Sequence, residues 1–503
     1  MKYLVLSVIF FVIFFPSFSQ NTPSERQLIE NVIQLYFDGW ATGDTTKLGK
    51  AMHASCHLKN YGNGKFTQYS RNEYISLFKP RERPKNLNTR IVTLDITNNM
   101  GSAKVEISTE KDLFTDYFNL MKTNEGWMIA DKVSTRTSHK TFDINLIKPE
   151  KETIIEGLKR PWSMAFISED EVLISEKEGD LVKYNLIKKE KIIIKGFPAD
   201  MADSIAYYHP GDNTGKFDVL LDPDFKINKF IYLSYASQTT KGKTTRIIRA
   251  VLENETLQQI KTLFVAEPYT WERVHYGGGM IFGNDGKLYF TIGERIFNEK
   301  DEPARPIAQN IEDKRGKIYR INPDGTIPKD NPDFGDNATP GLYATGIRAS
   351  QSLALETRTN KIWFSEHGTQ QGDEINVLKP GANYGWPVKT TGKYRFAEYA
   401  PTPVAGVSYT EPVWSWLHTV APTGLHFYSG NEFAAWNGNL LIGGLSRGSL
   451  WRMVIEDEKI KTSEELFTDD RLRIRKVVQS PMGKLYILTD DMNGRLIRIK
   501  QAQ

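Results

Sequence analysis

The sequence of 503 residues contains a single cysteine, Cys56, so no disulfide can form within the chain and a disulfide-stapled fold is excluded. The pattern Cys-x-x-Cys-His is absent, which excludes an attached c-type haem. An excess of one charge is also missing, because 65 Lys and Arg stand against 61 Asp and Glu, a net charge of +4. So balanced a chain gives no indication of a nucleic-acid or membrane-surface partner.

Long apolar runs are missing after the first twenty residues. Lys2 precedes an apolar run from Tyr3 to Phe15, and small residues follow it. This order predicts a secretory signal peptide over residues 1–19, cut near Ser19 or Gln20. The alternative is a short membrane anchor, but the run is shorter than the roughly 20 residues that a span needs. We therefore expect a secreted or periplasmic protein that is not embedded in a membrane.

The length predicts two or more domains, since an average domain has roughly 150 residues. Residues 22–141 have the pattern of an α+β domain. Thr22, Pro23 and Glu25 form a helix start, apolar residues recur at helical spacing, and Gly43 ends the pattern. Asp44 is placed to cap a second helix. Alternating segments then predict a hairpin turn and an antiparallel meander: Tyr61–Gly64, Arg90–Ile96, Ala103–Ser108, Tyr117–Lys122 and Trp127–Lys132.

The closing strands of this domain, Asp116–Leu120 and Gly126–Ile129, resemble those of the SnoaL-like cone fold, in which a curved sheet wraps a pocket against helices. That family includes enzymes, binding modules and oligomerisation domains, and the resemblance leaves these roles open. His53, His57 and Asp116 are candidates for lining the pocket. Because no recognisable carboxylate–histidine spacing accompanies them, we expect a non-catalytic role.

Residues 142–152 are predicted to be a linker, and residues 153–503 are all-β and repetitive. An apolar strand, a turn with Asp, Asn or Gly, and a second strand recur six times at intervals of roughly 45 to 80 residues, which suits four-stranded blades with long insertions. The chain is therefore predicted to be mainly β, a six-bladed β-propeller preceded by the small α+β cone-fold domain. The six second strands are Glu171–Ser175, Phe230–Ser234, Lys287–Thr291, Lys361–Ser365, Asn439–Gly443 and Lys484–Leu488.

Function in a propeller lies in the loops at one end, and two loop clusters there carry basic side chains that suit chemistry. His275 precedes three glycines, whose bare backbone leaves room for a flat ligand, and a neutral imidazole suits a general base. The alternative is a structural histidine. Arg473 and Arg475 alternate on one strand and point the same way, so they suit an anionic ligand, unless they form a solvated face.

Two further clusters are Tyr343–Arg348 and Ser365–Asn376, the latter followed by Asn383–Pro387. In Ser365–Asn376, adjacent carboxylates lie near glycine carbonyls, and hard oxygen ligands of this kind suit calcium rather than zinc. The alternative is an acidic turn that is capped by its own backbone amides.

Together these clusters resemble one family, the soluble quinoprotein sugar dehydrogenases, which oxidise aldoses with pyrroloquinoline quinone (PQQ). The resemblance runs from about Gly157 to Ile499, nearly the whole predicted propeller. Besides the four clusters it is carried by Leu158–Phe166, Leu221–Phe225, Gly316–Asn322, Asp324–Pro332, Gly372–Asn376 and Asn383–Pro387.

The resemblance implies a role for each matching residue. His275 would take the proton from the sugar's anomeric hydroxyl while a hydride passes to the quinone. Arg348 would lie beside the quinone oxygens, and Arg473 and Arg475 would hold PQQ. Asn213 stands at a further cofactor contact.

The resemblance also implies two calcium ions. One would bridge PQQ to the carbonyls of Gly368 and Thr369. The second, structural ion would use two carbonyls and two carboxylates, from His367, Tyr384, Asp373 and Glu374. The partners would then be an aldose and a separate electron acceptor, with no nucleic acid; a homodimer stays open.

The sequence departs from the family pattern at six positions where the family has another side chain: Asn213, Gly279, Ala349, Thr369, Tyr394 and Ser446. Lost side-chain donors weaken cofactor binding, at about 1 kcal/mol for each buried hydrogen bond. They favour a rival interpretation, a propeller that binds a saccharide or another ligand without oxidising it. A third class, a calcium-dependent hydrolase such as a lactonase, would need carboxylate and Asn ligands converging on the axis, which the sequence does not offer in matching order.

Overall fold

The computed structural model describes residues 24–62, 65–84, 87–109, 112–138, 149–202, 213–295, 306–394 and 406–502. The predicted signal peptide, residues 1–19, lies outside these ranges. The described residues divide into two compact units, one of residues up to 107 with 114–136 and one that contains the residues from 137 on. Within the described ranges, no helix combines the length and the apolarity that a bilayer crossing requires.

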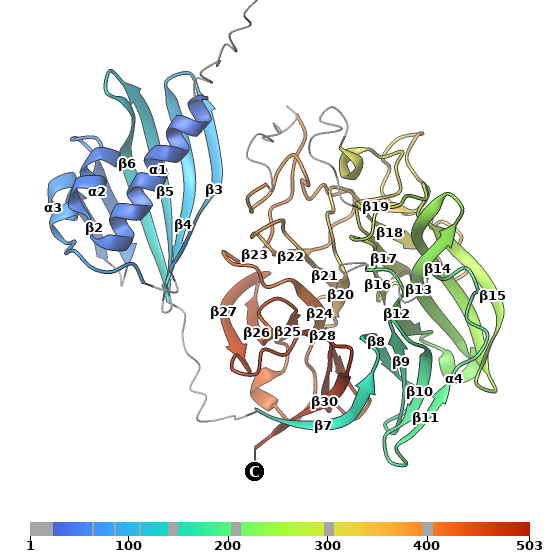
Figure 1. Cartoon of the computed structure of the whole chain (residues 1–503). Helices are drawn as coiled ribbons and strands as arrows, with labels where there is room; N and C mark the ends of the chain where they lie inside the picture. Colours follow the sequence, from blue (N-terminus) through green and yellow to red (C-terminus); the bar gives the residue numbers. More distant parts are fainter. Residues whose placement is uncertain are drawn as a thin grey trace, which may run out of the picture. The chain divides into compact units, whose positions relative to one another are not determined.

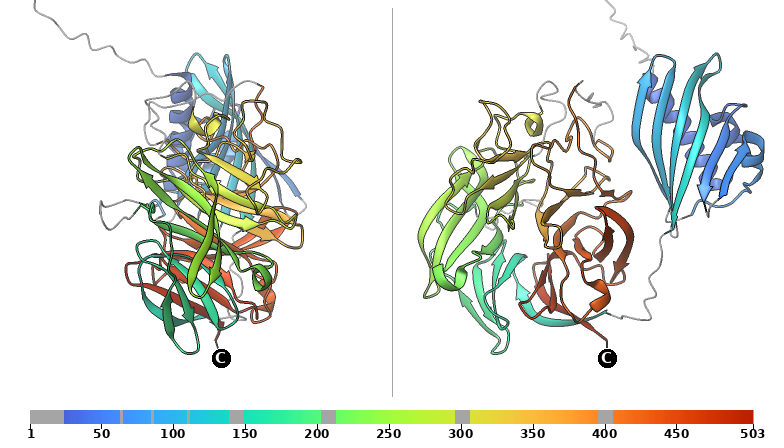
Figure 2. Two further views of the ribbon diagram at one scale, coloured as in Figure 1. Left: turned by 90° about the vertical axis from the view of Figure 1, so that its right-hand side faces the viewer. Right: turned by 180° about the vertical axis from the view of Figure 1, so that it is seen from behind.

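The first unit is an α+β fold whose helices lie against one face of a sheet (Figure 1 and Figure 2). The six strands run in the order β2-β1-β6-β5-β4-β3, and the predicted meander is confirmed in β3 to β6. The elements are α1 (Glu25–Thr42), α2 (Thr45–Ala51), β1 (His57–Gly62), β2 (Lys65–Ser70), α3 (Arg71–Ser76), β3 (Asn88–Thr97), β4 (Met100–Ser108), β5 (Asp112–Thr123) and β6 (Gly126–Ser138).

The first helix begins later than predicted. Ser24, not Thr22, is its N-cap, because the Ser24 hydroxyl accepts a hydrogen bond from the Gln27 amide at 3.2 Å. Thr22 and Pro23 lie outside the described residues. The predicted end at Gly43 is confirmed, with φ of 70°, a conformation that glycine adopts without strain. Asp44 caps α2 as predicted.

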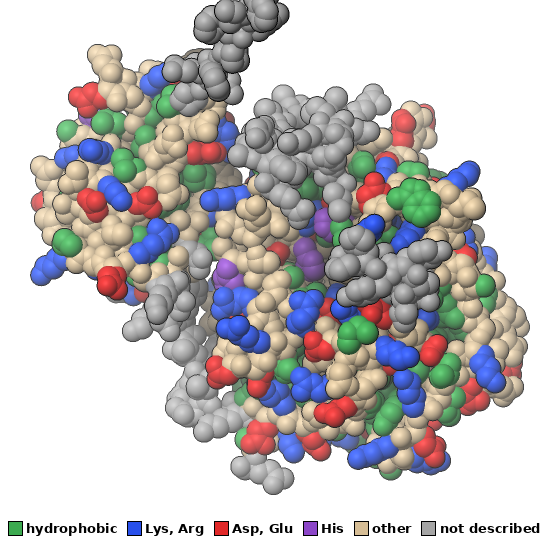
Figure 3. Space-filling view, viewed as in Figure 1, with side chains coloured by type: hydrophobic (Ala, Val, Ile, Leu, Met, Phe, Trp, Pro, Cys, Tyr) green, Lys and Arg blue, Asp and Glu red, His purple; other side chains and the backbone are tan. Residues whose placement is uncertain are grey.

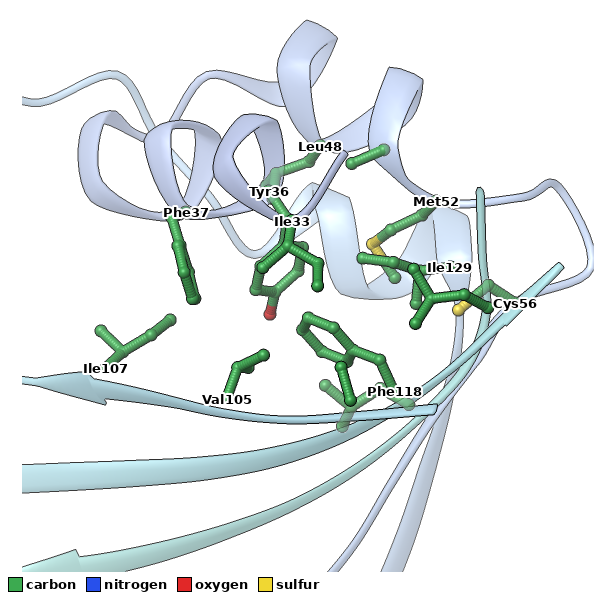
Figure 4. Close-up of a cluster of buried hydrophobic side chains, with 14 of the residues drawn as sticks. Ile33, Tyr36, Phe37, Leu48, Met52, Cys56, Val105, Ile107, Phe118 and Ile129 are labelled. Atoms are coloured by element: carbon green, nitrogen blue, oxygen red, sulfur yellow. The ribbon is translucent and has the colours of Figure 1, made fainter. Parts of the chain in front are cut away.

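The core of this unit joins α1 to the sheet (Figure 4). Tyr36 and Phe37 point from α1 toward Val105 of β4 and Phe118 of β5, and all four side chains are buried. The predicted grouping of His53, His57 and Asp116 is not what the structure shows. Asp116 pairs instead with Lys132 at 2.8 Å, both nearly fully buried, while His53 bonds its neighbour Ser55. The ion pair with Lys132 accounts for the burial of the Asp116 carboxylate, so no catalytic role is needed to explain it.

The second unit is built from six four-stranded sheets. The first sheet contains β8 (Pro161–Phe166), β9 (Glu171–Glu176), β10 (Leu181–Asn185) and β11 (Glu190–Ile193). The second contains β12 (Lys216–Leu221), β13 (Phe230–Thr239), β14 (Gly242–Glu253) and β15 (Thr256–Val265). The third contains β16 (Gly277–Phe282), β17 (Leu288–Ile292), β18 (Lys317–Ile321) and β19 (Leu342–Ala344). The short helices α4 (Phe225–Asn228), η1 (Ile307–Gln309) and η2 (Ala434–Trp436) lie in connections.

The other three sheets repeat this plan, and the last one closes the unit. They are β20 (Ser352–Glu356), β21 (Lys361–Glu366), β22 (Glu374–Val377) and β23 (Trp414–Ser415); β24 (Pro422–Phe427), β25 (Leu440–Gly444), β26 (Leu450–Glu456) and β27 (Lys459–Leu466); and β28 (Ile474–Gln479), β29 (Leu485–Thr489) and β30 (Gly494–Gln501) with β7 (Pro149–Leu158). Each of the six predicted second strands is the second strand of a sheet, as predicted.

One predicted boundary is wrong. The linker was expected to run over residues 142–152, but Pro149–Glu152 belong to β7, which pairs antiparallel with β30. These residues show no apolar alternation because β7 is the outer strand of its sheet, where one edge and much of its surface face solvent.

The first strands of the six sheets contact one another in sequence order, and β28 contacts β8, so the sheets follow one another around a ring (Figure 1). Since first and second strands are antiparallel, the starts of the first strands and the ends of the second strands lie at the same end of this ring. That arrangement is typical of a β-propeller.

Asp218 of β12 ties the inner strands together. Its carboxylate accepts hydrogen bonds from the Ser163 hydroxyl of β8, from the Met280 amide of β16 at 2.8 Å and from the Lys476 ammonium of β28 at 3.0 Å. Asp218 is 2% exposed, so four sheets share one buried carboxylate.

Replacement of Asp218 by Ala should lower the free energy of unfolding by about 3–5 kcal/mol, because Lys476 loses its buried counter-charge. The urea midpoint of the Asp218→Ala variant measures this loss. Asp224→Ala, which alters an exposed carboxylate that makes no capping hydrogen bond to α4, serves as the control. Equal midpoints for both variants would show that Asp218 does not hold the ring together.

Candidate active site

The predicted site residues gather at one end of the ring. Most of them follow the second strand of a sheet or lie before or near the start of a first strand, whereas Glu374 begins β22 and Tyr384 follows it. Figure 3 shows histidine, lysine and arginine side chains together near the middle of one face of this unit. The loops therefore place basic side chains around the centre, as the sequence analysis expected.

His275 lies just before β16 and contacts a buried carboxylate. Its Nδ1 lies 2.8 Å from Oε1 of Glu294, whose side chain is 1% exposed, while the imidazole is 19% exposed. His275 has φ of 56°, a conformation that costs a non-glycine residue free energy. Arg295 holds this backbone by donating to the His275 carbonyl at 2.9 Å. The imidazole is thus oriented by a carboxylate at one nitrogen.

Arg348 lies before β20 and is connected to both the His275 region and the acidic loop. Its carbonyl accepts a hydrogen bond from the Glu294 amide at 2.9 Å. Its guanidinium donates to the carbonyls of His367 and Gly368, at 2.9 and 2.7 Å. Its backbone amide donates to the Glu366 carboxylate. Burial, with the nearby Glu374 carboxylate, raises the pKa of Glu366 well above its usual range.

Arg473 and Arg475 share one carboxylate, Asp490, which follows β29. Their guanidinium groups donate to Oδ2 of Asp490 at 2.8 and 2.9 Å. Burial alone would raise the pKa of Asp490, but Arg475 and Arg473 more than offset it, so the pKa lies below its usual range. The Arg475 side chain is 6% exposed and that of Arg473 is 47% exposed. The predicted solvated face therefore applies at most to Arg473.

Asn213, before β12, connects the loop that contains Lys177 to the segment before His275. Its side-chain oxygen accepts a hydrogen bond from Nζ of Lys177 at 3.2 Å, and its amide donates to the carbonyl of Arg273, two residues before His275. Lys177 follows β9 and is 4% exposed. Since Lys177 also interacts with Arg475 and Asp490, polar contacts connect loops of the first, second, third, fourth and sixth sheets.

The acidic turn is capped by backbone amides in this structure. One oxygen of Asp373 accepts from the Gly368 amide at 2.8 Å, and the other accepts from the Val420 and Ala421 amides at 2.6 and 2.7 Å. Glu374 accepts from the Thr391 hydroxyl at 2.5 Å. No three acidic, His or Cys side chains in the described ranges converge as a metal site. These hydrogen bonds agree with the alternative of an acidic turn capped by backbone amides, and the calcium site stays a prediction.

The two other residues of the expected structural calcium are also engaged. Nε2 of His367 donates to the Pro422 carbonyl at 3.0 Å, and burial lowers the pKa of the imidazole to about 4, so the ring is neutral. The Tyr384 hydroxyl donates to the Val377 carbonyl at 2.6 Å. The expected ligands are the backbone carbonyls of these two residues, and the His367 carbonyl accepts a hydrogen bond from Arg348 at 2.9 Å. The structural calcium therefore stays a prediction.

Two departures from the family pattern have a physical explanation here. A Cβ at Gly279 would lie 2.5 Å from the Gln351 carbonyl oxygen, so the neighbouring backbone occupies the space that a side chain would need. Ala349 is 1% exposed, and its carbonyl accepts from the His367 amide at 3.4 Å. At both positions the surrounding residues pack closely where the family has a larger side chain.

The remaining departures keep polar contacts of other kinds. The Thr369 hydroxyl donates to the Lys393 carbonyl, and the Tyr394 hydroxyl donates to the Pro387 carbonyl at 2.6 Å. Ser446 is exposed. The neighbouring Arg447 pairs with Glu465 of β27 at 3.0 Å, so its guanidinium binds a strand of the same sheet.

Sequence reasoning missed four charged residues of this end of the ring: Lys177, Glu294, Glu366 and Asp490. All four lie at the end of a second strand or within two residues after it, and that position was the available signal. Their partners lie 15 to 36 residues away along the chain, on other loops, so only the fold could pair them.

The fold and this polar centre define a ring of sheets with a basic site at one end, and comparison with known proteins gives the family. Residues 158–498 match the family described as Glucose / Sorbosone dehydrogenase. The chain therefore belongs to the glucose/sorbosone dehydrogenase family. Residues 24–134 match a second family, described as Putative lumazine-binding.

Individual relatives agree with this assignment. The chain is 31% identical over 357 residues to the aldose sugar dehydrogenase YliI of Escherichia coli strain K12, which covers 69% of this chain and 92% of the relative. It is 27% identical to quinoprotein glucose dehydrogenase B of Acinetobacter calcoaceticus, over 68% of this chain and 85% of the relative. The crystal structure of the soluble aldose sugar dehydrogenase of Escherichia coli in its apo form superposes with a TM-score of 0.63, at 30% identity, over 71% of this chain and all of the other.

If Asp373 acts as a backbone cap, Asp373→Ala should lower the free energy of unfolding by about 3 kcal/mol, because three backbone amides lose a charged acceptor. Chelation of calcium should leave the melting temperature of the unaltered protein unchanged. Asp336→Ala, at an exposed carboxylate, is the control. A melting temperature that falls on chelation in the unaltered protein but not in Asp373→Ala would instead show a structural calcium.

Proposed function

We propose that this chain is an exported quinoprotein dehydrogenase that oxidises an aldose sugar at its anomeric carbon by hydride transfer to PQQ, with calcium. Its second unit would be a six-bladed β-propeller, and its first unit a non-catalytic SnoaL-like domain. The observation that carries the proposal is the arrangement of His275, paired with Glu294, at the same end of the ring as a cation cluster of Lys177, Arg473 and Arg475.

The residues at this end fit an anionic, flat cofactor. PQQ carries three carboxylates, and here Arg475, Arg473 and Lys177 surround a single carboxylate, Asp490. Nε of Arg475 is buried and makes no hydrogen bond to the described residues, so it has donor capacity left for a ligand. The glycines after His275 add no side chains at this edge. When bound, PQQ supplies an ortho-quinone that accepts two electrons as a hydride.

His275 would act as the general base. A carboxylate only accepts hydrogen bonds, so ionised Glu294 fixes the proton of the neutral imidazole on Nδ1 and leaves the lone pair on Nε2. Nε2 would accept the proton of the anomeric hydroxyl as the anomeric C–H bond gives up its hydride. The sugar thereby loses one proton and one hydride and becomes a lactone. Glu294 stabilises the imidazolium that forms.

Arg348 would contribute positive charge next to the reacting carbonyl of the cofactor. Its guanidinium is held by two backbone carbonyls and lies over the ring of Trp386, with 5.2 Å to the ring centroid. A guanidinium fixed in this way needs little reorganisation as negative charge develops nearby. Arg348 thus has the charge and rigidity for the role that the family resemblance gives it.

Calcium at the carbonyls of Gly368 and Thr369 is part of the proposal. The Gly368 carbonyl already faces a cationic group, Nη1 of Arg348 at 2.7 Å. A hard cation there would share or replace that contact, with backbone oxygens that suit calcium. The predicted export over residues 1–19 and the absence of a Cys-x-x-Cys-His motif in the sequence support a secreted or periplasmic enzyme that passes electrons to a separate acceptor.

A second candidate function is ligand binding without oxidation. The packed backbone at Gly279 and the buried methyl group of Ala349 favour it, because both positions lack the side-chain donors of the family. It predicts that the protein binds a saccharide in the absence of PQQ. Equilibrium dialysis with radiolabelled aldoses, with and without PQQ, separates the two functions, since the enzyme requires PQQ for any turnover.

In the PQQ-loaded protein, His275→Ala should lower kcat for aldose oxidation by about 10²–10⁴-fold, because the anomeric proton loses its acceptor. The dissociation constant for PQQ should stay the same, since His275 does not belong to the cation cluster. Dye-linked turnover and a PQQ titration measure the two quantities. His53→Ala, in the other unit, is the control, and unchanged turnover in His275→Ala would remove His275 as the base.

Reconstitution of activity by PQQ should require calcium. An excess of chelator during reconstitution should reduce aldose oxidation to background, because the Gly368 and Thr369 carbonyls would then lack the calcium ion that they are proposed to hold. The far-UV spectrum, recorded in parallel, controls for unfolding. Full activity with chelator present would show that calcium is not needed, and that Arg348 supplies the positive charge at this position.

A further inference from the structure

Lys177 belongs to the cation cluster although it lies far from the arginines in the sequence. It follows β9 of the first sheet, whereas Arg473 and Arg475 lie at β28 of the last sheet, and the ring makes these two sheets neighbours. Lys177 is 4% exposed and donates to the Asn213 side chain at 3.2 Å. Its position between Asn213 and the arginines therefore results from ring closure.

The charges around Lys177 do not balance. Besides Arg475 and Asp490, it faces Arg160 and Glu178, which pair with each other at 3.1 Å. Among the described residues, that leaves three cations, Lys177, Arg473 and Arg475, against the one carboxylate of Asp490. Two of the three cations are nearly fully buried, and a buried charge without a counter-charge is costly. An anion bound at the cluster would offset this excess of positive charge.

The titration of Lys177 agrees with this imbalance. Burial, and next the positive charge of Arg475, lower the pKa of Lys177 from 10.5 to about 8. The buried Nε of Arg475 makes no hydrogen bond to the described residues, which is a second sign of an unsatisfied donor. An anion placed here would stabilise the ammonium form and meet both deficits.

We propose that Lys177 is a further cofactor-binding residue, whose ammonium group binds a carboxylate of PQQ together with Arg473 and Arg475. This inference rests on the proposed function. It also accounts for Ser446: the family's glucose-oxidising branch is expected to have a lysine there, and Lys177 supplies a cation at the same end of the ring from a different sheet. Lys177 thus compensates for one of the sequence departures.

The inference makes a prediction about protons. In the free protein Lys177 loses its charge as the pH rises through about 8, and an anionic ligand favours the protonated form and raises the pKa again. Binding of PQQ at pH 9 should therefore take up close to one proton, and affinity should fall as the pH rises above about 8. Below that pH the ammonium is already present, so uptake by Lys177 should vanish.

Isothermal titration of the full-length apo-protein with PQQ, in two buffers of different ionisation enthalpy, measures both affinity and proton uptake. Lys177→Met should weaken binding by about 10- to 100-fold at pH 7 and abolish the uptake at pH 9. Lys177→Arg keeps the charge at every pH, so it should retain affinity and lose the uptake. Lys226→Met, at an exposed lysine of α4, should behave like the unaltered protein.

Two outcomes would contradict the inference, and they differ from each other. If the unaltered protein and Lys177→Met bind PQQ equally with equal proton uptake, Lys177 does not contact the cofactor, and the proposed function stands. If the unaltered protein does not bind PQQ at all, both the proposed function and the inference are wrong. Circular dichroism of each variant confirms that a loss of binding is not a loss of fold.

Discussion

The pairing of β7 with β30 is the constraint on which the second unit depends. It joins the first strand of this unit to its last, over Pro149–Leu158 and Gly494–Gln501, and completes the sixth sheet. With six complete sheets, β28 can contact β8 and the inner strands close into a ring. Only then do the ends of six second strands and the starts of six first strands meet. The site is therefore a product of closure rather than of any one sheet.

Closure also explains the chemistry of the site. Each loop supplies one or two polar groups, and their partners come from other loops: Glu294 for His275, Asp490 for Arg475, Asn213 for Lys177. The pairs hold side chains that would otherwise repel one another or point to solvent. What remains is an oriented imidazole and an excess of positive charge, which are the two features that an oxidation of a sugar by an anionic quinone requires. The central claim is that this end of the ring holds such a cofactor next to His275.

Strand periodicity and the repeated strand pair were sufficient to predict the meander of the first unit and the second strands of the six sheets. His275, Arg348 and Arg475 could be singled out because short motifs surround them. The N-cap at Ser24 and the start of β7 at Pro149 were missed, because a cap depends on one local hydrogen bond and an outer strand carries no apolar alternation. Lys177 and Asp490 could not be found at all. The partners of Lys177 include Arg475, hundreds of positions away, and the pairing of Asp490 with Arg475 depends on two loops that only the folded sheet brings together.

The most direct test of the central claim is an anaerobic absorbance measurement on the protein loaded with one equivalent of PQQ and calcium, to which a panel of aldoses is added. We expect at least one aldose to reduce the bound quinone and bleach its absorbance, with one equivalent of lactone formed per site. Binding of PQQ without bleaching by any aldose would contradict the account, because the imidazole and the cofactor would then not lie within reach of the same substrate.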